Sequence, residues 1–178
     1  MSLRQPKSMQ NYTEMGFKKI KAPEAVFKLI KDFWDSNKDK ASEENWSTGN
    51  TYTNHWVANT DFVSIENPAL RGGGALIKRR IWDAARNTLQ EWVGQELTEC
   101  SLYGIRIYKE GSVLATHVDR LPLVTSAIIN VDQVRVVWLE RWRLHCVCSR
   151  NKWSHLLCLV LATRGGCYVR NILDAILL

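Results

Sequence analysis

The sequence predicts an α+β protein in which an antiparallel β core carries N-terminal helices packed on one side. Two segments with apolar residues at helical spacing, near 23–34 and 75–93, come before a series of strand-like runs. The clearest runs, 102–108 and 125–131, are rich in β-branched and aromatic residues. An eight-stranded jelly roll fits this order, although only four or five strands are convincing before residue 134.

The first helix is expected to begin at Pro23, because proline suits the first helical turn. Residues 1–16 before it are polar and are expected to be loosely held. The charged stretch 37–44 after it predicts a loop. The apolar face of the helix is formed by residues at helical spacing: Val26, Phe27, Ile30, Phe33 and Trp34.

Two short strands and a glycine-rich break precede the second helix. Residues 46–56 are aromatic and threonine-rich, which favours a strand, and 62–65 predict another. Arg71-Gly-Gly-Gly74 predicts a flexible connection. The second helix is expected from about Ala75 to Val93, with Gly94 placed to end it. Its apolar side consists of Ile77, Ile81, Ala85, Leu89 and Trp92.

Composition indicates a packed domain. The 178 residues suit one domain with a proper core, and a hydrophobic fraction of 46% argues against disorder. No apolar run approaches the ~20 residues of a membrane span. The N-terminus lacks the apolar region of a signal peptide, so we expect no membrane association and a cytoplasmic location.

Charge and cysteine are unevenly distributed. Residues 134–178 carry seven basic and two acidic side chains, a net +5, which leaves +1 for residues 1–133. Four of the five cysteines also fall in this last segment, and it contains no proline. The chain therefore consists of two segments of different composition, which meet near Gln133.

The trio His117-Val118-Asp119 lies between the two clearest strand-like runs. Residues i and i+2 of a strand point to the same face, so an imidazole and a carboxylate are expected side by side. They would form two-thirds of the 2-His-1-carboxylate triad that holds non-haem Fe(II). A histidine on a strand often has a purely structural role. Here the residues around His117 favour a metal ligand instead.

The segment 102–133 resembles the catalytic domain of the prolyl 4-hydroxylase-like 2-oxoglutarate/Fe(II) dioxygenases. The pattern that carries the resemblance is a tyrosine, a glycine three residues on and then His-x-Asp: Tyr108, Gly111 and His117-Val-Asp119. The continuation through Arg120-Leu-Pro and 126–131 is similar to the next strand of that family. Residues 49–56 and 71–74 are similar to one branch of small members, so the resemblance covers about 16–133.

The resemblance implies a double-stranded β-helix and an Fe(II)-dependent hydroxylation in which 2-oxoglutarate is converted to succinate. It implies His117 and Asp119 as iron ligands and catalytic residues. Tyr108 becomes a candidate hydrogen-bonding partner of 2-oxoglutarate, with a plain core aromatic as the alternative. Arg120 is placed to orient the ligand carboxylate or to meet substrate. Ascorbate is a candidate additional cofactor, and the substrate is a protein side chain or a small molecule.

The C-terminal segment departs from this family. The family's second histidine is expected roughly 40–60 residues beyond Asp119, a distance of three or four strands with their turns. No histidine follows His155, and the arginine or lysine that grips 2-oxoglutarate has no clear counterpart. We therefore divide the chain into a flexible segment 1–16, a dioxygenase-like domain 17–133 and a divergent basic tail 134–178.

This departure suggests that the reading frame or splice pattern leaves the family after Gln133. The jelly roll would then be incomplete at its C-terminal end and would expose open strand edges. His155 or His145 remains as an alternative third ligand, and Arg164 or Arg170 as an alternative cation. A zinc site at Cys146, Cys148, Cys158 and His155 lacks the usual Cys-x-x-Cys spacing.

Three functions follow from the sequence. The leading one is a member of the Fe(II)/2-oxoglutarate dioxygenases by common descent. It leaves open whether this particular chain is catalytically active. The second is a non-catalytic binding module on the same scaffold. The third is a basic nucleic-acid-binding protein through the tail, where Trp138, Arg141, Trp142 and Arg143 interleave aromatic and basic side chains. Because no nucleic-acid-binding module is recognisable, the third is the least favoured.

Overall fold

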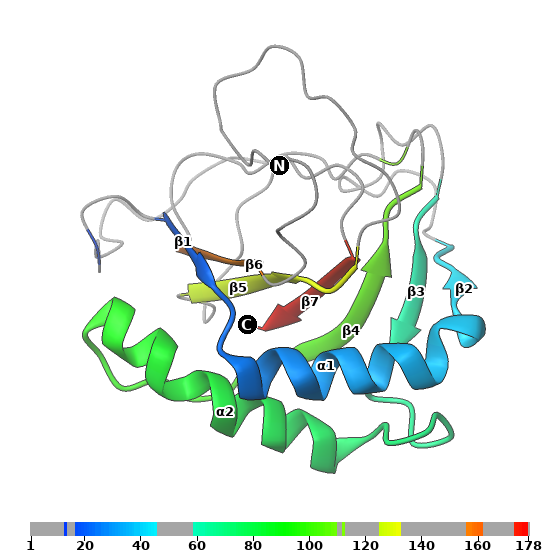
Figure 1. Cartoon of the computed structure of the whole chain (residues 1–178), viewed down its shortest axis with the longest axis horizontal. Coiled ribbons are helices and arrows are strands. Elements are labelled where there is room, and N and C mark those ends of the chain that lie inside the picture. The colour runs from blue at the N-terminus through cyan, green and yellow to red at the C-terminus, as the bar shows by residue number, and fades with distance from the viewer. Residues whose placement is uncertain are drawn as a thin grey trace.

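The computed structural model describes residues 13, 17–45, 59–109, 112, 125–132, 156–161 and 173–177. For residue 17 and for the last two segments it describes the backbone alone. The described chain mixes helix and sheet, which confirms the α+β class (Figure 1). In chain order the elements are β1 (Phe17–Lys21), α1 (Glu24–Asn37), the 3-10 helix η1 (Lys38–Lys40), β2 (Ser42–Glu43), β3 (Asp61–Ser64), α2 (Ala75–Val93), β4 (Leu102–Ile107), β5 (Thr125–Asn130), β6 (Leu156–Leu161) and β7 (Leu173–Leu177).

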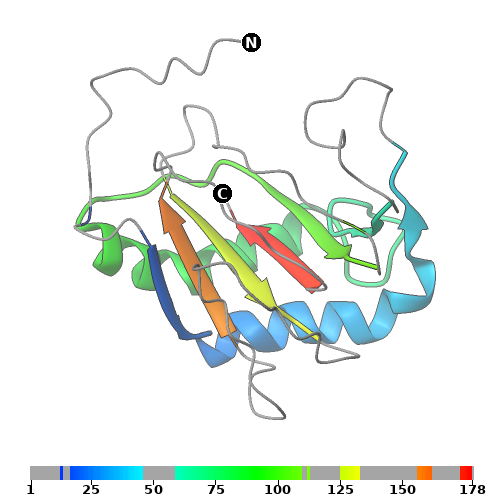
Figure 2. The same cartoon turned by 90° about the horizontal axis from the view of Figure 1, so that it is seen from above.

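The seven described strands form one sheet in the order β1-β6-β5-β7-β4-β3-β2, and every pair is antiparallel. The last strand in the chain, β7, lies between β4 and β5 (Figure 2). In the register, Ala175 of β7 faces Ile105 of β4 on one side and Ile129 of β5 on the other. Thus β4 and β5 share a sheet through β7 and do not pair with each other.

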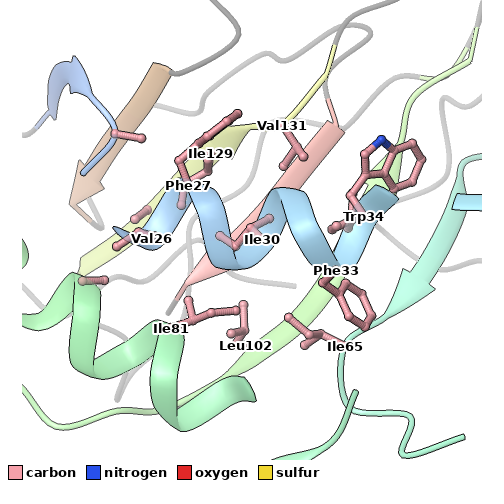
Figure 3. Close-up of a cluster of buried hydrophobic side chains, with 14 of the residues drawn as sticks. Val26, Phe27, Ile30, Phe33, Trp34, Ile65, Ile81, Leu102, Ile129 and Val131 are labelled. Carbon is pink, nitrogen blue, oxygen red and sulfur yellow. The ribbon is translucent and has the colours of Figure 1, made fainter. Parts of the chain in front are cut away.

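Both helices cover the same face of this sheet, as the sequence led us to expect (Figures 1 and 2). Pro23 precedes the first residue of α1, and its carbonyl accepts a hydrogen bond from the N–H of Phe27. The five apolar positions assigned to this helix from the sequence are all buried. Figure 3 shows side chains of α1 in one cluster with Ile129 and Val131, at the end of β5. The helical spacing of the apolar residues therefore sets which side of α1 meets the sheet.

The second helix has the predicted bounds, Ala75–Val93. Ile81, Ala85 and Leu89 are buried along one side of it. Gly94 ends the helix in a left-handed conformation with φ 71°, and its N–H donates to the carbonyl of Gln90. A residue with a Cβ is strained at such a φ, which explains why glycine stands there.

Several expectations need correction. The chain does not begin with a helix, because β1 precedes α1, and the expected loop 37–44 contains η1 and β2. The eight-stranded jelly roll is not confirmed. We expected open strand edges after Gln133, and in the described sheet β7 pairs with both β4 and β5, while β6 pairs with the other edge of β5. The tail 134–178 thus supplies two strands to the sheet. The expected strand 46–56 lies outside the described residues, whereas that at 62–65 is confirmed as β3.

In the part of the chain that the structure describes, neither helix is long and apolar enough to cross a membrane.

The position of β7 can be tested by placing proline in it. Ala175→Pro removes a backbone N–H from a strand that is bonded on both sides and leaves a carbonyl unpaired, so we expect a loss of about 1–3 kcal/mol in the free energy of unfolding. Lys18→Pro is the control, because β1 has a partner only in β6 within the described sheet. Urea unfolding measures both variants. Equal effects would contradict a central position for residues 173–177.

The helix–sheet core can be tested by truncating Ile30, whose side chain is 0% exposed. Ile30→Ala should lower the free energy of unfolding by about 2–5 kcal/mol, because it removes buried apolar surface and leaves a cavity. Leu76→Ala is the matched control, since Leu76 is 71% exposed on α2. A loss at Ile30 as small as that at Leu76 would show that α1 is not packed in this way.

Candidate functional site

The face of the sheet that points away from the helices carries polar residues. Ile105 and Ile129 belong to the core on the helix side, so their strand neighbours Arg106 and Asn130 point to the opposite face. Asn130 is buried there, and so is Ser126 two rows along β5. In the backbone register Asp174 of β7 is the partner of both Arg106 and Asn130. A row of three polar residues therefore crosses β4, β7 and β5.

An ion pair between Arg106 and Glu44 dominates the β4 side of this face. Arg106 Nε lies 2.6 Å from Glu44 Oε2, and Nη2 lies 2.8 Å from Oε1. The two side chains are only 16% and 11% exposed. The Thr60 hydroxyl also donates to Glu44 Oε2, and the Glu44 N–H donates to the Thr60 carbonyl at 2.8 Å. This bidentate geometry fixes the planes of the guanidinium and the carboxylate relative to each other. It also makes the pair stronger than a single neutral hydrogen bond.

The surroundings of Arg106 keep it charged. Burial disfavours the guanidinium charge, but the hydrogen bonds to Glu44 and the nearby Tyr108 outweigh it, so the pKa of Arg106 is raised. The guanidinium carbon also lies 5.8 Å from the ring centre of Phe62 on β3, within the range of a cation–π contact. Arg106 therefore joins β4, β3 and the segment that follows β2.

Tyr108 lies directly after β4, two residues beyond Arg106, and is 6% exposed. Residues i and i+2 of an extended chain point the same way, so Tyr108 shares the polar face with Arg106. Its effect on the pKa of Arg106 agrees with this placement. The sequence placed Tyr108 in a strand 102–108, whereas β4 ends one residue earlier, at Ile107. Its burial is compatible with both roles left open from the sequence, a core aromatic and a cosubstrate contact.

A second set of charges lies at the surface next to this end of β4. Lys109 Nζ is 2.7 Å from Asp61 Oδ1 and 3.3 Å from Glu43 Oε2. The hydrogen bond to Asp61 raises the pKa of Lys109. Asn59 Nδ2 donates to Glu43 Oε1 at 3.1 Å, and this bond, with the help of Lys109, lowers the pKa of Glu43. Exposed pairs of this kind contribute little to stability.

The chain turns after Lys109, as the sequence predicted. The N–H of Ser112 donates to the Lys109 carbonyl at 3.0 Å, three residues back, which is the bond of a tight turn. The Ser112 hydroxyl also donates to the Asn59 carbonyl at 3.1 Å. The second bond ties Ser112 to the residues just before the start of β3.

The expected iron ligands His117 and Asp119, and the neighbouring Arg120, lie outside the described residues. Their place in the chain is between Tyr108 and Thr125, the first residue of β5. Among the residues that the structure describes, no three His, Cys, Asp or Glu side chains are grouped to hold a metal ion. The described site therefore consists of the polar face, with Tyr108 as the one predicted site residue that it places.

The sequence analysis did not identify three residues of this face: Arg106, Asn130 and Glu44. Arg106 could have been predicted, because alternation along the strand puts it on the same side as Tyr108. Asn130 could have been predicted from the same alternation on β5. Glu44 carried no signal, since 62 positions separate it from Arg106 and only the folded sheet brings them together.

The ion pair predicts unequal costs for two cations. Arg106→Gln leaves the carboxylate of Glu44 buried without its cation, so we expect the free energy of unfolding to fall by about 3–5 kcal/mol. Lys109→Gln removes an exposed pair and should cost less than about 1 kcal/mol. Urea denaturation followed by tryptophan fluorescence measures both. Losses of similar size would mean that the Arg106 pair is exposed to water.

Neither the models of known protein families nor the curated proteins include a match for this chain.

Proposed function

We propose that this chain carries the scaffold of an Fe(II)/2-oxoglutarate-dependent dioxygenase of the prolyl 4-hydroxylase-like group. The observation that carries the proposal is the placement of Tyr108. It is buried at the end of β4 on the polar face, nine residues before His117 in the sequence. This is the order that the resemblance requires, with the cosubstrate contact leading into the iron-binding pair.

The strand order gives further support. In a jelly roll, strands that follow each other in the chain do not all pair, because later strands return by long connections to lie beside earlier ones. Here β7 returns to lie between β4 and β5, and β6 lies on the far side of β5. We infer that this interleaved sheet, with helices on one face and polar residues on the other, corresponds to one half of a double-stranded β-helix.

The chain's own residues have separable roles in this proposal. His117 and Asp119 are the metal ligands, one imidazole and one carboxylate on a single extended segment. Tyr108 hydrogen-bonds a carboxylate of 2-oxoglutarate, and Arg120 orients the ligand carboxylate or meets substrate. Iron and 2-oxoglutarate, when bound, supply the oxidising chemistry that no side chain can supply. The sheet and its helices exclude water from one side.

A second candidate function has its own support. A binding module on the same scaffold would keep the sheet and the polar face without turnover. The sequence favours this candidate at one point, because no histidine follows His155 to complete the triad of ligands. Two protein ligands hold Fe(II) less securely than three, so the two candidates differ in metal content and in succinate release.

Iron analysis of the purified protein tests the proposal. We expect Fe(II) to bind under anaerobic conditions, His117→Ala to lose most of it, and His55→Ala to retain it as the matched control. Addition of 2-oxoglutarate should produce a weak visible charge-transfer band, and O₂ should then yield succinate.

Equal iron in the wild type and in His117→Ala would overturn the ligand assignment. Iron and the absorption band without succinate would leave the binding module as the function of this chain.

A further inference from the structure

We propose that Arg106, fixed by Glu44, is a positioning residue that holds Tyr108 in the orientation needed to bind 2-oxoglutarate. This inference rests on the proposed function. It assigns to the polar face of β4 a role for a cation that does not itself touch the cosubstrate. The resembled family uses an arginine or lysine to bind a carboxylate of 2-oxoglutarate, and this chain has no clear counterpart of it. A buried arginine near Tyr108 could be mistaken for that residue, but we assign Arg106 a different role.

The geometry of the ion pair argues against direct binding of 2-oxoglutarate by Arg106. Two of its donors, Nε and Nη2, are already taken by the two oxygens of Glu44. These two donors form one bidentate side of the guanidinium. A dicarboxylate could meet only the remaining N–H groups of Nη1 and Nη2, on a cation whose charge is already paired with Glu44. Displacing Glu44, which is 11% exposed and also bonded by Thr60, would leave a buried carboxylate unpaired.

The same geometry suits a positioning role. Glu44 is anchored through its backbone to Thr60 and through its side chain to both Thr60 and Arg106. Arg106 is in turn flanked by the Phe62 ring on β3. The guanidinium is therefore held from two elements, and Tyr108 lies two residues further along the same face, near enough to raise the pKa of Arg106.

A tyrosine that binds a ligand must be held within about half an ångström of its productive position, and neighbouring side chains supply that restraint. Burial alone fixes the ring of Tyr108 but not the direction of its hydroxyl. A guanidinium that Glu44 holds on the same face, two residues before Tyr108, would fix that direction, because the phenol oxygen is attracted to the cation and its O–H is left to point elsewhere.

Binding of 2-oxoglutarate, measured by calorimetry with Mn(II) in place of Fe(II), is the first readout. Tyr108→Phe and Arg106→Gln should each weaken binding about tenfold, the effect of one lost hydrogen bond to a charged ligand. The double variant should bind about as weakly as either single variant, because the two residues act through one contact. Tyr103→Phe and Lys109→Gln are controls expected to leave binding unchanged, since Tyr103 is 50% exposed and Lys109 pairs at the surface.

The second readout does not need a ligand. The chain has five tyrosines, so 3-fluorotyrosine labelling gives five ¹⁹F resonances, and Tyr108→Phe identifies that of Tyr108. Arg106→Gln should shift or broaden this resonance, and Lys109→Gln should leave it in place. If Arg106→Gln does not fold, Glu44→Asp is the second variant. It keeps both charges, shortens the carboxylate side chain that holds Arg106, and should shift the same resonance.

Multiplicative weakening in the double variant would overturn the inference, because it would mean that Arg106 binds 2-oxoglutarate directly. An unmoved Tyr108 resonance in a folded Arg106 or Glu44 variant would overturn it too. A wild type that fails to bind 2-oxoglutarate would instead refute the proposed function, and the ¹⁹F resonance would then decide alone whether Arg106 positions Tyr108.

Discussion

The fold depends on one strand, β7, because it supplies the only backbone pairing between β4 and β5 in the described sheet. Each of its neighbours carries one part of the molecule's chemistry. Tyr108 follows β4, and the His117–Asp119 segment leads into β5. Because β7 lies between β4 and β5, these two strands are separated by two strand spacings, roughly 10 Å. The same strand aligns Ile105 with Ile129, so the core under the helices needs it as well.

The two faces of the sheet differ in composition and in role. The helix side is built from aliphatic residues with almost no exposed surface, and it provides the stability expected of buried apolar groups. The other side keeps Arg106, Tyr108, Ser126 and Asn130 away from that core. Buried polar groups cost free energy unless they are paired, and on this face Arg106 is paired with Glu44. The Arg106–Glu44 pair gives the face a fixed electrostatic pattern.

Local patterns in the sequence predicted both helices, β3, β4 and β5. Ile81, Ala85 and Leu89 repeat at helical spacing, and Gly94 marks the end of the helix, so α2 required no tertiary information. The strand β1 was missed because three of its five residues are lysines, which mask any alternation. The strand β6 reads as an unbroken apolar run, Leu156–Leu161, in which periodicity cannot distinguish strand from helix. The candidate site divides in the same way. Tyr108 was proposed through the resemblance to a known family, whereas Glu44 and the position of β7 depend on contacts between distant parts of the chain.

The central claim is that residues 173–177 lie between β4 and β5. Backbone NMR tests it most directly, through nuclear Overhauser effects between amide and Hα protons of paired strands. The account predicts cross-strand effects from Ala175 to Ile105 and also from Ala175 to Ile129, in antiparallel register. Direct effects between Ile105 and Ile129, or none from residues 173–177 to either strand, would contradict it.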